Sequence, residues 1–122
     1  MVGGPSLSLY EETALDWLLG FESQQADGGH VGFLSWHAYG WTSAEMAGQV
    51  RAARALAARK RPGDPLELMI TELNTRTGGP GDTSVDNQAD TPAAAVHLLA
   101  SIAALEAAGL DKLFVFELRD GP

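Results

Sequence analysis

The chain has 122 residues, of which 45% are hydrophobic and 20% charged, a composition typical of one globular domain spanning residues 1–122. Its 8 basic and 16 acidic residues give a formal net charge of -8, which argues against nucleic acid and anionic membranes as partners. With no Cys, disulfides, a thiolate nucleophile and thiolate metal ligands are excluded. No run is long and apolar enough to span a bilayer. Residues 1–5 lack a signal-peptide pattern, and the location stays open because a leader is removed on maturation.

The chain begins with residues typical of a turn and continues into a predicted helix. Gly3-Gly4-Pro5-Ser6 has the composition of a turn, so we expect the chain to start at the end of an element. From residue 10 to residue 24 the apolar spacing predicts an amphipathic helix. Its apolar residues are Leu15, Trp17, Leu18, Leu19 and Phe21.

A strand and a second helix follow. Residues 31–36 are a short apolar and aromatic run, typical of a buried strand, and this run exits at His37-Ala38-Tyr39-Gly40. Thr42 and Glu45 have the spacing of a capping box. We therefore expect a helix from this point to about Arg59.

The next strand ends on a carboxylate. Leu66, Leu68 and Ile70 alternate with more polar residues at a period of two, which predicts a strand over residues 66–72. Counting by twos places Glu72 on the same face as Leu68 and Ile70. A carboxylate on a buried face costs free energy unless it is paired or functional. The alternative is a strand-end acid that turns into solvent.

A long loop, a third helix and a fourth apolar run complete the chain. The glycine-rich loop over residues 75–90 has the length of a functional or mobile segment. Pro92 fits the first turn of a helix capped by Thr91 or Asp90. We expect this helix to turn one apolar row inward and residues 113–116 to form a strand. The expected inward row is Val96, Leu99, Ile102 and Leu105.

Strands that alternate with helices predict an α/β fold with a parallel sheet. Two architectures fit: an open doubly wound sheet or part of a (β/α)8 barrel. In both, the strand exits at His37, Glu72 and Glu117 gather at one end of the sheet, where such folds place their chemistry. Residues 78–81 are rich in glycine but no Lys-Ser/Thr follows, so a nucleotide site is not expected.

The strand exits, taken in order, resemble a known enzyme family. Gly3-Gly4-Pro5, Phe33-Leu34-Ser35-Trp36-His37-Ala38-Tyr39 and Ile70-Thr71-Glu72-Leu73-Asn74 look like consecutive strand-end motifs of family 39 glycoside hydrolases. That family includes β-xylosidases and α-L-iduronidases and belongs to the retaining (β/α)8 glycosidases. The resemblance extends from Gly3 to about Asp120, and it implies strands five to eight of such a barrel.

The resemblance implies a role for each matching residue. Glu72 would be the catalytic nucleophile, and His37 and Tyr39 would line the sugar subsite. Retaining hydrolysis needs one carboxylate that attacks the anomeric carbon and a second, ~5–5.5 Å away, that protonates the leaving oxygen. The remaining candidate substrate-binding residues are Trp41, Asn74 and Glu117. Trp41 and Tyr39 would stack on a sugar, or they simply pack in the core. Glu117 would hydrogen-bond the substrate or replace the missing acid.

The sequence lacks some features of the family, and these differences predict a half-barrel. The Asn-Glu-Pro motif that carries the family's acid/base Glu is absent, and Leu73 stands where Trp often follows the nucleophile. A full barrel takes ~250 residues. We therefore expect a C-terminal half-barrel, either a fragment or a half completed by another chain, and inactive alone. The alternative is a non-catalytic half-barrel that binds sugar or a partner subunit.

We expect no metal or cofactor, and either self-association or a missing N-terminal half-barrel as the partner. Residues 82–93 loosely match a calcium loop, but Asn87 replaces the sixth-position Gly and Ala93 the twelfth-position Glu. His30 and His97 have no ligand spacing, and we expect both to be surface or capping residues.

Overall fold

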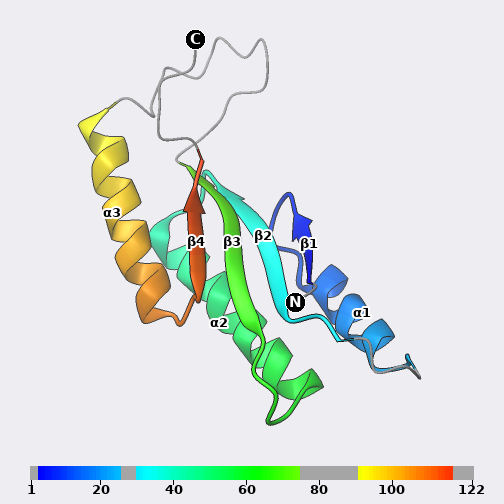
Figure 1. Ribbon diagram of the computed structural model, residues 1–122. Coiled ribbons are helices and arrows are strands. Elements are labelled where there is room, and N and C mark those ends of the chain that lie inside the picture. Colours follow the sequence, from blue (N-terminus) through cyan, green and yellow to red (C-terminus); the bar gives the residue numbers. More distant parts are fainter. Residues whose placement is uncertain (1–2, 26–29, 75–90, 117–122) are drawn as a thin grey trace, which may run out of the picture.

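A computed structural model describes residues 3–25, 30–74 and 91–116, and in these residues strands and helices alternate along the chain. In Figure 1 the elements are coloured in chain order, from blue at the N-terminus to red at the C-terminus. They are β1 (Gly4–Leu7), α1 (Glu12–Glu22), β2 (Phe33–Tyr39), α2 (Ser43–Lys60), β3 (Glu67–Asn74), α3 (Pro92–Ala107) and β4 (Lys112–Val115).

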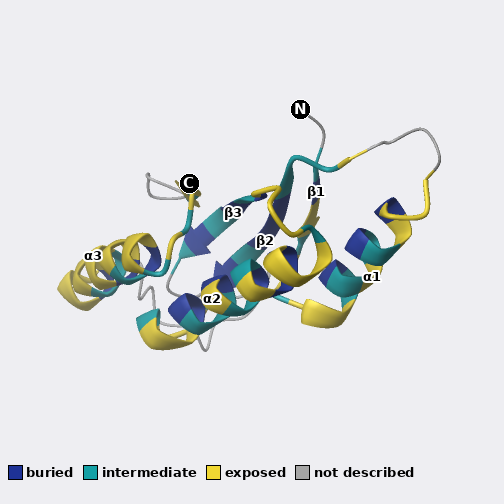
Figure 2. Cartoon of the chain, turned by 90° about the horizontal axis from the view of Figure 1, so that it is seen from below, coloured by how far each residue is buried: buried dark blue, intermediate teal, exposed yellow. Residues whose placement is uncertain are grey.

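The strands form one sheet whose spatial order equals the chain order, β1-β2-β3-β4, and each neighbouring pair is parallel. All three described helices lie on the same side of this sheet (Figure 2). Right-handed crossovers that always step in one direction produce this arrangement. A doubly wound sheet reverses its strand order and carries helices on both faces, and the described part of the chain shows neither. The prediction of a parallel α/β fold is confirmed.

The hydrophobic core lies between the sheet and the helix layer. On β2 the inward residues are Leu34, Trp36 and Ala38, and Trp36 is fully buried. Each large apolar side chain buried here contributes about 1.5–3 kcal/mol to folding. The other core residues are Leu15, Leu19, Met46, Val50, Ala53, Leu56, Ala57, Leu66, Leu68, Ile70, Leu73 and Leu105. We call the opposite side of the sheet, which carries no described helix, the open face.

Two helices begin where their sequences predict. Thr42 and Glu45 form the predicted capping box of α2, in which each side chain bonds the backbone N–H of the other. Thr91 caps α3 by accepting a hydrogen bond from the backbone of Ala94, with Pro92 in the first turn. Of the two caps considered for this helix, Thr91 is the one used.

Two predicted boundaries were wrong. The β2 strand continues to Tyr39, so His37 and Tyr39 lie within it instead of after it. Residues Gly4–Leu7 form a short edge strand where the sequence predicts only a turn. Pairing with β3 extends β2 to Tyr39, and pairing with β2 makes residues 4–7 a strand. Local composition predicts neither, because it does not register a neighbouring strand.

The predicted face of Glu72 was also wrong. Trp36 of β2 pairs with Ile70, but the next residue, His37, pairs with Glu72, so Thr71 is an extra residue in β3. Such a bulge reverses the side-chain alternation. Leu73 therefore joins the core after Ile70, and Glu72 turns to the open face.

The predicted inward row of α3 was wrong at three of its four positions. Val96 and Leu99 are 67% and 68% exposed, and Ile102 is 38% exposed, while Leu105 is buried as expected. Ala94 and Ser101 occupy the buried face instead. The helix is apolar on nearly every side, so its spacing does not mark the side that packs.

Candidate functional site

Glu72 lies on the open face with two side chains of the neighbouring strand against it. The Tyr39 hydroxyl donates a hydrogen bond of 2.5 Å to Glu72 Oε2, and His37 Nδ1 lies 3.5 Å from the same oxygen. The pairing of His37 with Glu72 and of Tyr39 with Asn74 places all these groups near the carboxyl ends of β2 and β3. The structure thus brings together three of the predicted site residues, Glu72, His37 and Tyr39.

The Tyr39 phenol is a fixed hydrogen-bond donor. Burial raises its pKa well above the ordinary value, and the hydrogen bond to Glu72 and the negative charge of that carboxylate raise it further. The phenol therefore stays protonated at neutral pH. One oxygen of the Glu72 carboxylate is held by this bond, while the Glu72 side chain remains 34% exposed on the open face.

One hydroxyl group lies beside His37, and two further serines are linked to it by hydrogen bonds; none of the three was a predicted site residue. Thr71 Oγ1 donates to the Trp36 carbonyl at 3.2 Å and lies 3.4 Å from His37 Nδ1. Ser6 Oγ lies 3.1 Å from Thr71 Oγ1, and the Ser6 N–H donates to Ser35 Oγ at 3.0 Å. The bulge that introduces Thr71 has no clear sequence signal, so only strand register reveals this group.

The remaining predicted site residues are Trp41, Asn74 and Glu117, of which Asn74 lies at the same end of the sheet as Glu72. Trp41 is 37% exposed in the turn between β2 and α2 and has no described contact with Glu72. Asn74 follows Glu72 on β3 and donates from Nδ2 to the Phe116 carbonyl at 2.7 Å, which ties β3 to the end of β4. Glu117 lies outside the described residues.

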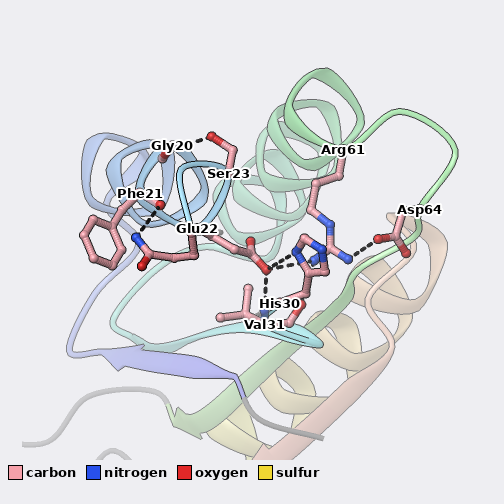
Figure 3. Close-up of polar contacts among 9 residues, drawn as sticks. Gly20, Phe21, Glu22, Ser23, His30, Val31, Arg61 and Asp64 are labelled. Atoms are coloured by element: carbon pink, nitrogen blue, oxygen red, sulfur yellow. Dashed lines mark hydrogen bonds and ion pairs between the residues drawn. The ribbon is translucent and has the colours of Figure 1, made fainter. Parts of the chain in front are cut away.

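A cluster of charged residues around Glu22 lies before the start of β2, at the end of the sheet opposite Glu72 (Figure 3). Glu22, at the end of α1, is only 5% exposed. Its Oε1 accepts hydrogen bonds from the Val31 N–H at 2.5 Å and from His30 Nδ1 at 3.1 Å, and lies 3.5 Å from Arg61 Nη1. The His30 side chain is 57% exposed, as the predicted surface role requires, but it also pairs with a buried acid.

Two arginines of the α2 region hold the starts of three strands. Arg61 donates to the Val31 carbonyl at 2.6 Å, next to β2. Arg54 donates to the Leu66 carbonyl at 2.5 Å, before β3, and to Asp111 Oδ2 at 2.6 Å, before β4. We call Glu22, Arg61, Arg54 and Asp111 the amino-end clamp.

The described cavities lie away from Glu72. One of about 300 Å³ lies on α1 beside Lys60, where Trp17 stacks on Phe21 at a centroid distance of 5.5 Å. Another of about 280 Å³ lies between the end of α2 and Leu66. In the residues with described positions, no three His, Asp or Glu side chains gather as metal ligands. Within the same residues no helix has the length and hydropathy needed to cross a membrane.

The arrangement around Glu72 holds its carboxyl group in a fixed direction. The Tyr39 phenol donates to Oε2 and orients the group. Such a group can act as a nucleophile or as a general base. No family model matches the chain, and neither a curated protein nor a solved structure matches it.

Proposed function

We propose that the chain is the C-terminal half of a (β/α)8 retaining glycoside hydrolase in which Glu72 is the nucleophile. The observation that carries this proposal is the 2.5 Å hydrogen bond from the Tyr39 hydroxyl to Glu72 Oε2 at the carboxyl ends of adjacent parallel strands. In barrels of this type the catalytic groups project from that end of the strands. The resemblance to family 39 glycoside hydrolases assigns the same role to Glu72.

The sheet supports the half-barrel part of the proposal. Its described strands follow the chain order with the described helices on one side, which is the arrangement of consecutive units of a barrel wall. The edge strands β1 and β4 each pair with one described neighbour only. Four further parallel strands would close the wall, and their source would be an N-terminal half-barrel or a second copy of this chain.

In the proposed reaction Glu72 attacks the anomeric carbon of a glycoside and forms a glycosyl ester as the glycosidic bond to the leaving oxygen breaks. Tyr39 keeps one carboxylate oxygen in place, which leaves the other available for attack. A carboxylic acid outside the described residues would protonate the leaving oxygen. Water would then hydrolyse the ester and release the sugar with retained configuration.

A mechanism-based label tests the nucleophile without the missing acid. A 2-deoxy-2-fluoro sugar with a dinitrophenyl leaving group needs no protonation to depart, and its glycosyl ester hydrolyses slowly. The 122-residue chain is incubated with xylosyl, glucosyl and iduronosyl forms of this reagent. A parallel sample contains an N-terminal half-barrel of a family 39 enzyme that carries Asn-Glu-Pro. We expect one fluoroglycosyl unit on the peptide containing Glu72, detected by mass spectrometry.

The controls separate specific from chance labelling. Glu72→Gln should abolish the label, whereas Glu106→Gln, an exposed glutamate on α3, should leave it unchanged. A label on another residue, or a complemented sample that hydrolyses aryl glycosides equally well with Glu72→Gln, would refute the assignment. A complemented sample that binds sugar with neither label nor turnover would favour the alternative of a non-catalytic sugar-binding half-barrel.

A further inference from the structure

The extra residue of β1 and the extra residue of β3 contact each other across β2. β1 has an irregularity between Pro5 and Leu7, which leaves Ser6 as its extra residue beside Trp36 of β2. β3 has its extra residue, Thr71, on the other side of the same tryptophan. The two side-chain oxygens are 3.1 Å apart, so both irregularities turn a hydroxyl group onto the open face above β2.

The backbone of Ser6 is held in a conformation that a serine rarely adopts. Its φ is 56°, in the left-handed region, which is unfavourable for a residue other than glycine. The Ser6 N–H donates to Ser35 Oγ, and Ser35 is 1% exposed, so a buried contact supports this turn. This backbone conformation places the Ser6 hydroxyl within hydrogen-bond distance of Thr71.

The hydrogen atoms of this group can be assigned from the chemistry of its members. Thr71 has one hydroxyl hydrogen, and the Trp36 carbonyl, which only accepts, takes it at 3.2 Å. Thr71 Oγ1 is then an acceptor toward both Ser6 and His37. Ser6 must donate its hydroxyl hydrogen to Thr71, and His37 Nδ1 can approach Thr71 favourably only as an N–H donor.

Glu72 imposes the same requirement on the imidazole ring. Its Oε2 lies 3.5 Å from His37 Nδ1, and an ionised carboxylate only accepts. An unprotonated Nδ1 would direct its lone pair at two acceptor oxygens. The proton of a neutral His37 therefore belongs on Nδ1, and Nε2, which no described residue hydrogen-bonds, is left as an acceptor.

We propose that Ser6 and Thr71 are a positioning pair that holds His37 with its proton on Nδ1, so that Nε2 accepts a hydrogen bond from a hydroxyl group of the bound ligand. The ligand identity, a sugar, rests on the proposed function. The positioning of His37 does not, because it follows from the contacts of the free chain. The pair contributes by orienting His37, and neither hydroxyl is assigned a contact with substrate.

Nuclear magnetic resonance of the histidine ring nitrogens tests the pair directly. The ¹⁵N shifts of His37, recorded at a pH where the ring is neutral, report which nitrogen carries the proton. We expect Nδ1–H in the native chain. Thr71→Val keeps the shape but loses the hydroxyl, and should move the tautomer ratio toward Nε2–H by about threefold to tenfold, the effect of one hydrogen bond. Ser6→Gly, which tolerates the positive φ, should move it less.

Two further variants make the result decisive. Thr71→Ser retains the hydroxyl and should restore the native tautomer, while Thr13→Val, at an exposed threonine of α1, should change nothing. A His37 ratio unchanged by Thr71→Val would overturn the positioning role whatever the turnover. If Thr71→Val shifts the ratio while no complemented sample is labelled at Glu72, the positioning role stands and the glycosidase proposal fails.

Discussion

Two glutamates at opposite ends of the sheet differ in their exposure and in their hydrogen-bond and ion-pair partners. Glu22 in the amino-end clamp is 5% exposed and lies against a backbone N–H, a histidine and Arg61. Glu72 at the carboxyl end is 34% exposed, and its described partners are Tyr39 and His37, with no Lys or Arg among its described ion-pair partners. The Glu22 carboxylate is tied to the structure by an arginine, whereas the Glu72 carboxylate lies on the open face and is oriented by a phenol.

The clamp glutamate should give the largest loss of stability. Glu22→Ala removes the buried acid beside Arg61, which keeps its exposed partner Asp64, and removes the acceptor of the Val31 N–H. We expect a loss of about 2 kcal/mol in the free energy of unfolding, measured by urea denaturation. Glu106→Ala on the exposed side of α3 is the control and should stay within about 0.5 kcal/mol of the native chain. A Glu22→Ala chain as stable as this control would remove the distinction between the two ends.

A smaller loss is expected at the start of β4. Asp111 Oδ2 accepts from the Leu68 N–H at 2.7 Å and from Arg54 at 2.6 Å. Burial raises the pKa of Asp111, but these hydrogen bonds and the charges of Arg54 and Lys112 outweigh it and hold the pKa below the ordinary value of 3.8. Because the side chain is 39% exposed, Asp111→Asn should cost only about 1 kcal/mol at pH 7.

The pH dependence of that loss has a definite sign. A lowered pKa stabilises the folded chain above the unfolded value, so the contribution of Asp111 is complete above pH 3.8 and disappears as the pH falls through the folded value. The Asp111→Asn chain should therefore lose less stability between pH 5 and pH 2 than the native chain. Asp16→Asn, which breaks only an exposed ion pair with Lys60, should retain the native acid profile. Equal acid profiles for Asp111→Asn and the native chain would contradict the assignment.

Substitution of Glu72 should change the stability least, but it should clearly lower the pKa of Tyr39. Glu72→Gln should alter the free energy of unfolding by about 0.5 kcal/mol or less. Burial keeps the pKa of Tyr39 raised in this variant, but the loss of the carboxylate charge and of the charge-assisted bond should lower it toward the ordinary value. Tyrosinate absorbance in a Tyr10→Phe background reports Tyr39 alone, because the chain has two tyrosines.

The alkaline stability of the chain follows from the same pKa. A raised tyrosine pKa stabilises the folded state fully below pH 10, the ordinary value, and this contribution is lost as the pH rises through the folded value. The stability of the Tyr10→Phe chain should therefore fall more steeply above pH 10 than that of the same chain with Glu72→Gln. Identical Tyr39 titrations with and without Glu72→Gln would show that the 2.5 Å bond is absent in solution.

Much of the fold was predictable because its signals are local. The capping box at Thr42, the Pro92 start of α3 and the apolar strands all reflect interactions within a few residues, and the structure contains each of them. The candidate site was predicted in part. Glu72, His37 and Tyr39 do meet, since polar groups at the ends of parallel strands gather at one edge, whereas Trp41 lies in the turn after β2 and Asn74 donates to the Phe116 carbonyl.

The amino-acid sequence by itself determined the alternation of strands and helices, the parallel sheet and the end of that sheet where His37, Tyr39 and Glu72 gather. Only the tertiary structure decided which face Glu72 occupies, which side of α3 packs and which arginines clamp the strands. The physical reason is that these depend on register and on contacts between distant segments. One inserted residue, Thr71, reverses the alternation, and Glu72 then lies on the open face while Leu73 enters the core.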